Sequence, residues 1–488
     1  MSKICVSVME QDLKAAAQAV QAAKEGGADL VEIRFDAMPS LPQDLACLKR
    51  IDIPKIATLR LASHGGRFEG GEEERLRFFR KCLRSGFDLL DAELGSQLMK
   101  HRYRELKRAS MICSYHDFSG TPPPSSIVEK LVLASSKEAL PKAAFMIRGA
   151  RDLLSLARAA KMYSATGKQF VLIGMGEMGE LTRIRADRLG CAFTYASLCK
   201  GKETAPGQID LATMRSFSKD SIVLGIVGHP LGHTLSPTMH QAALRAAGIS
   251  GKYLRFDLPP EELEDFIDVV LEYEIKGFNV TIPYKESIIP LLDQADSSAE
   301  VVGAVNTVVV RGGRLIGHNT DVYGIESTFK EKSIEPRSKR ALVIGAGGAA
   351  RAACSFLTSA GAEVWIYNRT QARAEALAKA FQGCAALGED SLRKTEFDII
   401  INCTPVGMEG FPKQLPLPIE TLRPGQFVMD TIYNPPETEL LRFAKQRGAI
   451  TANGESMLVH QAARSFALWT DAQVGVEVML SAIREARA

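Results

Sequence analysis

One pattern repeats through roughly the first 200 residues: a short apolar, β-rich run followed by a helical stretch. Stretches such as "QDLKAAAQAVQAAKEGG" lie between the runs and end on glycines, as helices commonly do. Eight β/α units in one segment of this length predict a (β/α)8 TIM barrel. The eight predicted strands cover residues 3–9, 30–36, 55–60, 89–94, 110–117, 142–148, 169–175 and 191–197.

A second α/β series follows, after "APGQIDLATMRSFSKDS" breaks the barrel pattern. Its strand-like runs are "SIVLGIVG", "KYLRFDL" and "KGFNVTIPYK", and a predicted hairpin then turns at Gly312-Gly313. The polar linker "KEKSIEPRSK" precedes "RALVIGAGGAARAACSFLTSAGAEVWIYNRT", which predicts a strand, a glycine turn, a helix and a second strand. The chain is therefore expected to be α/β throughout, with more than one domain in its 488 residues.

Composition excludes several classes of partner. The net charge of +3 demands no strongly basic face, so nucleic acid is not expected as a partner. No apolar run approaches the roughly 20 residues of a membrane span, and no targeting segment precedes the first strand. Nine scattered cysteines without metal-ligand spacing favour a reducing, cytoplasmic compartment. No metal is expected, because no acidic cluster accompanies the histidines of "GHPLGHTLSP".

The run "VIGAGGAAR" predicts a dinucleotide site. Glycines in such a turn let a pyrophosphate approach the N-terminus of the following helix, where free N–H groups favour anions. The second strand ends in Asn368-Arg369-Thr370, where NAD-binding folds usually place an acidic residue. An arginine there suits a 2′-phosphate, so NADP(H) is the expected cofactor. The alternative is a ligand-free turn beside a solvated arginine. The predicted turn residues are Gly345, Ala346, Gly347, Gly348 and Ala349.

From about residue 222 onward the chain resembles the shikimate dehydrogenase family. The resemblance rests on nine motifs in order: "GHPLGHTLSPTMHQ", "GFNVTIPYK", "GAVNT", "GHNTDVYG", "GAGGAAR", "NRT", "NCTPVGM", "DTIYNPPET" and "NGESMLVHQA". It implies that Lys285 and Asp321 form the catalytic pair, which suits a ketone reduction that needs a proton and a cation at the oxygen. It also implies a substrate site made of Thr234, Ser236, Thr281, Asn306, Tyr433 and Gln461, and further cofactor contacts from Thr404, Met408 and Gly454.

Within that resemblance, Thr234 and Ser236 are expected to bind the carboxylate of shikimate. The family usually has serine at both positions, so Thr234 keeps the hydroxyl and adds a methyl group. This departure leaves the choice between shikimate and quinate open.

Two residues of the predicted barrel have chemistry of their own. Lys142 begins a strand, and if its face points inward, burial disfavours the charged amine and makes Lys142 a candidate for Schiff-base chemistry. His116 ends another strand, on the side where barrel enzymes keep catalytic groups. Taken alone, a lysine at the start of a strand is usually solvated, and a lone histidine more often has a structural role.

Seven barrel motifs resemble the type I 3-dehydroquinate dehydratase family over about residues 3–215. They are "VEIRFD", "TLR", "DAEL", "SYHDF", "PKAAFM", "LTRIRADRLG" and "TAPGQID". The resemblance implies that Lys142 forms an imine with the substrate ketone and that His116 removes the adjacent proton. It places Glu32, Arg34, Arg60, Arg183, Thr204 and Gln208 around the substrate. One position departs: His64 stands where the family has a glutamate, and a neutral histidine would not raise the pKa of His116 as a carboxylate would.

The two resemblances occur together in a bifunctional family that performs consecutive reactions. The expected substrates are 3-dehydroquinate, 3-dehydroshikimate and shikimate, and the expected state is a monomer or homodimer. Two alternatives remain: a barrel enzyme fused to a quinate or polyol dehydrogenase, and a non-catalytic sensor of these compounds. The predicted domains are the barrel (1–218), a substrate-binding lobe (222–327), a Rossmann NADP-binding lobe (328–455) and C-terminal helices that close back on the substrate lobe (456–488).

Overall fold

The structure is a computed structural model that describes residues 2–102, 106, 110–136, 138–232 and 234–487. It divides into two compact units. The first comprises Met1–Ser221 and Leu254–Glu274, and the second comprises Ile222–Tyr253 and Ile275–Ala488. Within the described part of the chain, no helix combines the length and apolar character needed to cross a membrane.

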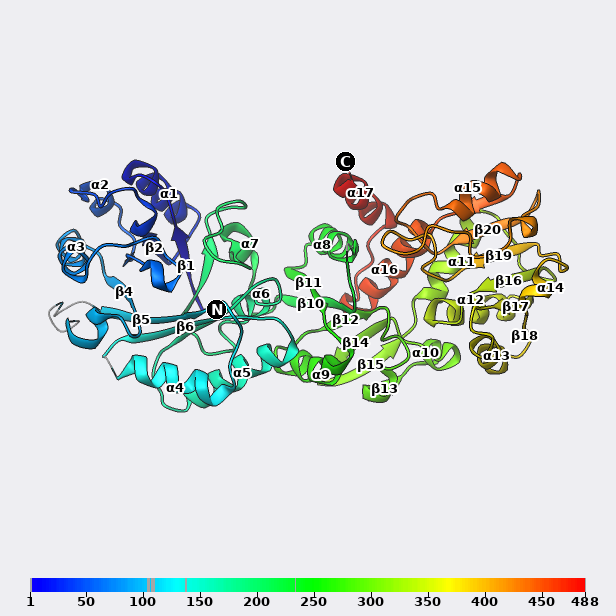
Figure 1. Ribbon diagram of the computed structural model, residues 1–488, viewed down its shortest axis with the longest axis horizontal. Helices are drawn as coiled ribbons and strands as arrows, with labels where there is room; N and C mark the ends of the chain where they lie inside the picture. Colours follow the sequence, from blue (N-terminus) through cyan, green and yellow to red (C-terminus); the bar gives the residue numbers. More distant parts are fainter. Residues whose placement is uncertain (1, 103–105, 107–109, 137, 233, 488) are drawn as a thin grey trace. The chain divides into compact units, whose positions relative to one another are not determined.

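The first unit contains the predicted eight parallel strands. They lie in the order β7-β6-β5-β4-β3-β2-β1-β8, with the short β9 (Ile209–Asp210) beside β8 (Figure 1). No ladder joins β7 to β8 among the described residues, but the Ala192 N–H donates to the Phe170 carbonyl at 2.8 Å just before them. The sheet is therefore curled into a barrel. Its strands are β1 (Lys3–Val8), β2 (Leu30–Arg34), β3 (Lys55–Thr58), β4 (Leu89–Glu93), β5 (Ser110–Asp117), β6 (Leu140–Met146), β7 (Val171–Met175) and β8 (Phe193–Ser197).

Helices cover the outside of this sheet because one face of each is apolar. Helix α1 begins where Asp12 accepts the Ala15 N–H at 2.8 Å, and its buried residues recur at helical spacing: Ala16, Ala19, Val20 and Ala23. Helices α4 and α5 lie along β5, β6 and β7 (Figure 1). The helices of the first unit are α1 (Leu13–Glu25), α2 (Ala46–Lys49), α3 (Glu72–Arg84), α4 (Pro124–Ser135), α5 (Ala150–Ser164), α6 (Glu180–Ile184), α7 (Leu211–Ser216) and α9 (Leu263–Glu272).

Two six-stranded sheets follow the barrel along the chain. The first is mixed, in the order β11-β10-β12-β14-β15-β13, and β14 and β15 form the predicted hairpin at Gly312-Gly313, where both glycines have positive φ. Its strands are β10 (Ile222–Gly228), β11 (Gly251–Asp257), β12 (Gly277–Val280), β13 (Gln294–Ala295), β14 (Thr307–Arg311) and β15 (Arg314–His318). The helices near it are α8 (Ser236–Ala246), α10 (Ser297–Val302) and α11 (Asp321–Glu331).

The second sheet is parallel, in the order β18-β17-β16-β19-β20-β21. The order reverses between β16 and β19, which is where doubly wound folds bind nucleotides. The predicted strand, glycine turn, helix and strand are confirmed as β16 (Arg340–Ile344), α12 (Gly348–Ser359) and β17 (Glu363–Tyr367). The other strands are β18 (Cys384–Ala386), β19 (Ile399–Asn402), β20 (Phe427–Asp430) and β21 (Ile450–Ala452).

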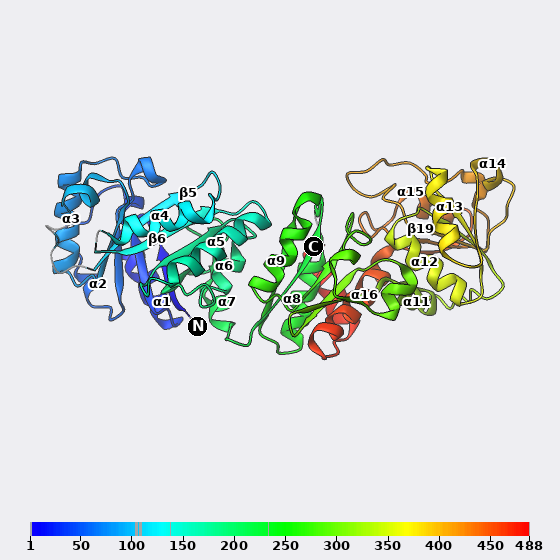
Figure 2. The ribbon, with the colours of Figure 1, turned by 90° about the horizontal axis from the view of Figure 1, so that it is seen from below.

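The last two helices of the chain pack on helices that flank the first of these two sheets. Helix α16 (Gly454–Thr470) lies beside α11 (Figure 2) and contacts α8. Helix α17 (Val476–Arg487) packs on α8. The remaining helices are α13 (Gln371–Ala380), α14 (Glu389–Leu392) and α15 (Glu439–Gln446).

A buried arginine ties the barrel wall to its interior. Arg75 of α3 is fully buried, and its guanidinium donates to the Glu93 carboxylate of β4 at 2.5 Å. Glu93 in turn accepts from Arg60 at 3.3 Å. A buried charge of this kind stabilises only while its partner remains in place.

Replacing Arg75 by methionine leaves Glu93 buried with one cation instead of two. We expect Arg75→Met to lower the free energy of unfolding by about 3 kcal/mol, measured by urea titration with circular dichroism. Arg77 is exposed on the same helix, so Arg77→Met is the matched control, with a change within about 0.5 kcal/mol. Equal stability of the two variants would contradict this account of Glu93.

Candidate active sites

The barrel encloses a cavity of about 220 Å³. It brings together every residue predicted for the barrel's chemistry, from six different strands or the segments that follow them. These residues are Glu32, Arg34, Arg60, His116, Lys142, Arg183, Thr204 and Gln208. His64, Tyr195 and Met175 also line the cavity.

Lys142 lies on β6 with its amine in this cavity and only 4% of its surface exposed. Its Nζ lies 3.0 Å from Oδ2 of Asp91 and 3.5 Å from Oε2 of Glu32. It also donates to the Tyr195 hydroxyl at 2.8 Å. The partners come from β4, β2 and β8, so the curvature of the sheet assembles this cluster. Two carboxylates offset the cost of burying the ammonium group.

Asp91 connects Lys142 to a second cation. Arg60 lies 3.0 Å from Asp91 and donates to the Ser114 hydroxyl at 2.6 Å, and Ser114 donates to Asp91 at the same distance. Burial alone would raise the pKa of Asp91, but the charges of Arg60 and Lys142 hold that pKa well below its usual range. Asp91 therefore stays ionised at neutral pH.

His116 ends β5 and lines the same cavity. Burial, and then the positive charges of Arg60 and Lys142, keep the pKa of His116 well below that of an ordinary histidine. The imidazole is thus neutral at pH 7 and free to accept a proton. His64 ends the short turn Ala62–His64 and lines this cavity too, so the departure from the family pattern falls within the site itself.

Arg183 gives the cavity a cation whose hydrogen bonds, among the described residues, go to the backbone carbonyls of Tyr195 and Pro206. It is 2% exposed on α6, its Nε has no hydrogen-bond partner in the described part of the chain, and burial lowers its pKa to about 10. Next to it, the N–H and hydroxyl of Thr204 point to Oε1 of Gln208, at 2.7 and 3.3 Å. Gly207 has φ +72°, and a Cβ there would lie 2.1 Å from the Gly176 carbonyl, so only glycine allows this loop. This side of the cavity, with its buried cation, is therefore suited to bind an anionic group of a substrate.

In the second unit, Lys285 and Asp321 form an ion pair of 2.5 Å. Lys285 follows β12, and Asp321 begins α11. Asn306 donates to the other oxygen of Asp321 at 2.8 Å and to Gln461 of α16 at 3.3 Å. The structure thus brings four of the predicted residues together in one hydrogen-bonded group.

Hydroxyl groups gather at the start of α8. Thr234 donates to the Ser236 hydroxyl at 3.2 Å. Burial raises the pKa of Tyr433, and interactions with the Leu235 backbone and the Thr234 side chain oppose that rise, so its hydroxyl lies close to both. Thr281 lies next to the same loop, because its N–H donates to Val227 and its methyl group faces Gly228. Hydroxyl groups gathered in this way can bind a carboxylate.

The glycine turn after β16 has room for a dinucleotide. Gly345 has φ +112°, and a Cβ at Gly347 would meet no atom within 4 Å. A Cβ at Gly348 would lie 2.8 Å from Cδ of Lys285, so the predicted catalytic lysine reaches the N-terminus of α12. Ala346 and Ala349 complete the turn. This open cradle, which an added Cβ would fill, fits a pyrophosphate.

The other predicted cofactor residues lie at strand ends of the same sheet. Asn368 bonds the Thr370 carbonyl at 2.9 Å between β17 and α13, and Arg369 is exposed there. Thr404 and Met408 lie in the loop after β19. Packing alone requires glycine at position 454, since a Cβ there would lie 2.1 Å from the Thr431 carbonyl oxygen.

Sequence reasoning missed several partners of these residues. In the barrel these partners are Asp91, Glu93, Ser114 and Tyr195. In the second unit they are Thr307, Thr320 and Ser465, whose hydroxyls are hydrogen-bonded to one another next to Asn306. The motif "DAEL" contained a signal, because Asp91 and Glu93 alternate along their strand and so share one face. No comparable signal marked Tyr195 or Ser465.

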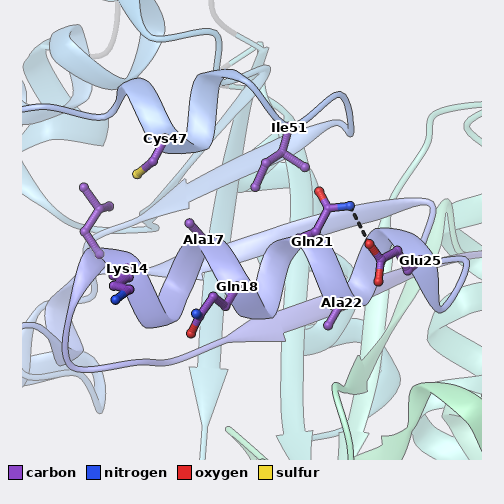
Figure 3. A pocket seen from close by; sticks show the side chains of 9 residues that line it. Lys14, Ala17, Gln18, Gln21, Ala22, Glu25, Cys47 and Ile51 are labelled. Atoms are coloured by element: carbon purple, nitrogen blue, oxygen red, sulfur yellow. Dashed lines mark hydrogen bonds between the residues drawn. The ribbon is translucent and has the colours of Figure 1, made fainter.

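A larger hollow of about 690 Å³ lies outside the barrel, between α1 and α2 (Figure 3). Its lining includes Lys14, Cys47 and Ile51, and two of its polar groups, Gln21 and Glu25, are hydrogen-bonded to each other at 2.7 Å. It contains none of the predicted site residues and no converging set of reactive groups.

Comparison with known proteins matches both units to enzyme families. The model of type I 3-dehydroquinase matches residues 4–221, and that of the shikimate dehydrogenase substrate-binding domain matches residues 226–308. The models of shikimate/quinate 5-dehydrogenase and of the shikimate 5′-dehydrogenase C-terminal domain match residues 328–408 and 454–484. An Arabidopsis thaliana protein described as a chloroplastic bifunctional 3-dehydroquinate dehydratase/shikimate dehydrogenase is 33% identical, over 96% of this chain and 82% of its own length. The chain belongs to this bifunctional family.

Single-function relatives resemble the part of this family member that follows the barrel. An NADP(+) shikimate dehydrogenase of Carboxydothermus hydrogenoformans is 42% identical over 53% of this chain and 95% of its own length. The structure of a Thermus thermophilus shikimate 5-dehydrogenase with NADP(H) and shikimate is 39% identical, with a TM-score of 0.51, and covers 54% of this chain and 99% of its own.

The neutral state of His116 can be measured directly. We expect the His116 imidazole to titrate clearly below pH 6.5, because burial and two nearby cations oppose its protonation. Histidine-labelled protein followed by NMR between pH 4 and 8 gives the titration, and the spectrum of His116→Gln assigns the signal. Titration at or above pH 6.5 would contradict the electrostatics of this cavity.

Proposed function

We propose that the chain catalyses two consecutive reactions: dehydration of 3-dehydroquinate to 3-dehydroshikimate in the barrel, and NADPH-dependent reduction of 3-dehydroshikimate to shikimate in the second unit. The observation that carries this proposal is a pair of lysines, each held by a carboxylate, one in the barrel cavity and one at the glycine turn. The bifunctional relative and the family models support it. The product of the first reaction is the substrate of the second.

In the barrel, Lys142 attacks the substrate ketone and forms an imine, with loss of water. The iminium group withdraws electrons and acidifies the adjacent C–H, and neutral His116 removes that proton. The hydroxyl on the neighbouring carbon takes that proton from His116 and leaves as a second water, which creates the double bond. One water then hydrolyses the imine, which releases 3-dehydroshikimate and regenerates Lys142. Arg183, Thr204 and Gln208 hold the carboxylate and hydroxyl groups of the substrate, and Glu32, Arg34 and Arg60 maintain the charges around it.

In the second unit, Lys285 and Asp321 act at the ketone oxygen. Bound NADPH supplies the hydrogen and the two electrons of the reduction. The Lys285 ammonium stabilises the negative charge that develops on the oxygen and donates a proton to it, while Asp321 keeps that ammonium in position. Thr234, Ser236 and Tyr433 bind the substrate carboxylate, and Thr281, Asn306 and Gln461 bind its hydroxyl groups.

NADP(H) would be held by three groups of residues. The turn from Gly345 to Ala349 would hold the pyrophosphate, and Asn368, Arg369 and Thr370 would bind the 2′-phosphate of the adenosine ribose. Thr404, Met408 and Gly454 would contact the rest of the cofactor. The proposed domain boundaries follow the same division: 1–218, 222–327, 328–455 and 456–488. A cytoplasmic location, a monomeric or homodimeric state and independence from metal remain predictions.

Quinate is the second candidate substrate for the dehydrogenase. It is favoured by Thr234, whose methyl group changes the carboxylate-binding loop, and by the shikimate/quinate family model. Comparison of turnover with shikimate and with quinate decides between them. A non-catalytic sensor is disfavoured, because both lysines keep their carboxylate partners.

The experiment that tests the proposed function supplies 3-dehydroquinate and NADPH together. We expect shikimate to accumulate with equimolar loss of NADPH absorbance. In the Lys142→Ala variant we expect neither shikimate accumulation from 3-dehydroquinate nor trapping of the substrate by borohydride. The same variant should still reduce 3-dehydroshikimate when that compound is supplied directly. The Lys285→Ala variant should dehydrate 3-dehydroquinate at the native rate and reduce 3-dehydroshikimate about 10²–10⁴-fold more slowly. Substrate binding without turnover at either site would refute the proposal and favour the sensor.

The choice of NADP(H) depends on Arg369. We expect Arg369→Ala to raise the KM for NADPH about 10- to 100-fold and to leave the KM for NADH nearly unchanged, because NADH has no 2′-phosphate. Arg373 is exposed one turn further along the chain, so Arg373→Ala is the matched control. Equal effects on both cofactors would show that Arg369 does not bind the 2′-phosphate.

A further inference from the structure

Tyr195 of β8 touches the amine that the proposed function makes the nucleophile. Its hydroxyl lies 2.8 Å from Nζ of Lys142, and Nζ lies 4.3 Å from the centre of its ring. The side chain is 3% exposed and lines the barrel cavity. Its ring packs edge-on against Phe193 at 5.5 Å, two residues earlier on the same face of the strand.

A carboxylate lies beside the same pair of groups. Glu32 is 3.5 Å from the Nζ atom that donates to Tyr195, and its interaction with the phenol raises the pKa of Tyr195, so a phenol that accepts a proton from Lys142 can pass its own proton to Glu32. Burial, and then the negative charge of Glu32, keep the pKa of Tyr195 well above that of an ordinary tyrosine. The phenol therefore stays neutral, and it can transfer one proton only while it receives another.

The proposed imine chemistry needs such a path. Lys142 is an ammonium held by carboxylates, and an amine attacks a ketone only after it loses a proton. Asp91 is the nearest carboxylate, at 3.0 Å, but Arg60 and Ser114 also bind it and favour its ionised form. Glu32 lies further from Nζ, at 3.5 Å, and no arginine lies within ion-pair distance of it among the described residues. Glu32 is therefore the better acceptor for the proton.

We propose that Tyr195 is a catalytic residue of the dehydratase, which relays a proton from Lys142 to Glu32 and back. This inference rests on the proposed Schiff-base function. As Lys142 gives a proton to the phenol oxygen, the phenol gives its own proton to Glu32. The neutral amine then forms a bond to the ketone carbon, and the ketone oxygen takes a proton from the same nitrogen.

The return step completes the imine. The proton on Glu32 passes back through the phenol to the hydroxyl group of the adduct, the C–O bond breaks, and water leaves. Both hydrogens of that water come from the ammonium group, and the nitrogen keeps one hydrogen and the positive charge. Tyr195 and Glu32 end in the states in which they began, so no other reactant is needed.

The test measures how fast the imine forms. Protein and 3-dehydroquinate are mixed, quenched with borohydride at successive times, and the reduced adduct on Lys142 is quantified by mass spectrometry. We expect Tyr195→Phe to slow adduct formation about 10²-fold, although it keeps the ring and its contact with Lys142. Tyr163 is a buried tyrosine of α5 outside the cavity, and Tyr163→Phe is the matched control with an unchanged rate.

The pH dependence separates a relay from a packing role. Without the relay, the ammonium must lose its proton to solvent before the amine reacts, so we expect the rate in Tyr195→Phe to rise with pH, by about tenfold per pH unit while the ammonium form predominates. The rate of the native chain stays nearly constant from pH 6 to 8. Glu32→Gln keeps the tyrosine but removes the acceptor, so we expect its adduct formation to be equally slow and equally dependent on pH. The double variant with Tyr195→Phe and Glu32→Gln should be no slower than either single variant.

Several outcomes would overturn the relay. One is a Tyr195→Phe rate equal to that of the native chain, and another is a slower rate with an unchanged pH profile. If Tyr195→Phe fails to fold, Glu32→Gln alone decides by the same two measurements. If the native chain forms no adduct at all, the Schiff-base function itself is refuted. If the native chain forms the adduct no faster than its variants, only the relay is refuted.

Discussion

A row of alternating charges inside the barrel holds the dehydratase site together. From the wall inward it contains Arg75, Glu93, Arg60, Asp91 and Lys142, each within ion-pair distance of the next. All are 4% exposed or less, so each charge stays buried only because its neighbours have the opposite sign. Strands β3, β4 and β6 and helix α3 must keep their register for these pairs to form. The position of the reactive amine therefore depends on the packing of the whole barrel wall.

Most of the barrel could be predicted from sequence because its elements are local. Apolar runs bounded by helical stretches located all eight strands, and helices such as α1 ended near the glycines that marked them. Strand ends differed by up to two residues. The predicted strand at 55–60, for example, ends at Thr58, and Arg60 lies beyond it, where its side chain is free to cross to Asp91.

The cluster around Lys142 could not be predicted in the same way. Tyr195 lies 53 residues from Lys142, and Glu32 lies 110 residues from it. Alternation along one strand shows which residues share a face, but it does not show the register between strands, which sets what lies opposite. The pattern suggested an isolated, desolvated lysine. The structure instead surrounds that lysine with two carboxylates and a phenol, because burial of an unpaired charge would be too costly.

The two lysines show how one residue type can serve opposite chemistry. Lys142 must lose a proton before it reacts, and its surroundings supply a phenol and a carboxylate that can take that proton. Lys285 must keep its charge until the ketone oxygen needs it. Its partner Asp321 is held in place by Asn306, which donates to the other oxygen of the carboxylate, and by its own backbone N–H, which donates to the Asn319 side chain. A carboxylate whose other oxygen already accepts a hydrogen bond is a weaker proton acceptor. The difference between a nucleophile and an acid thus lies in what holds the carboxylate beside each lysine.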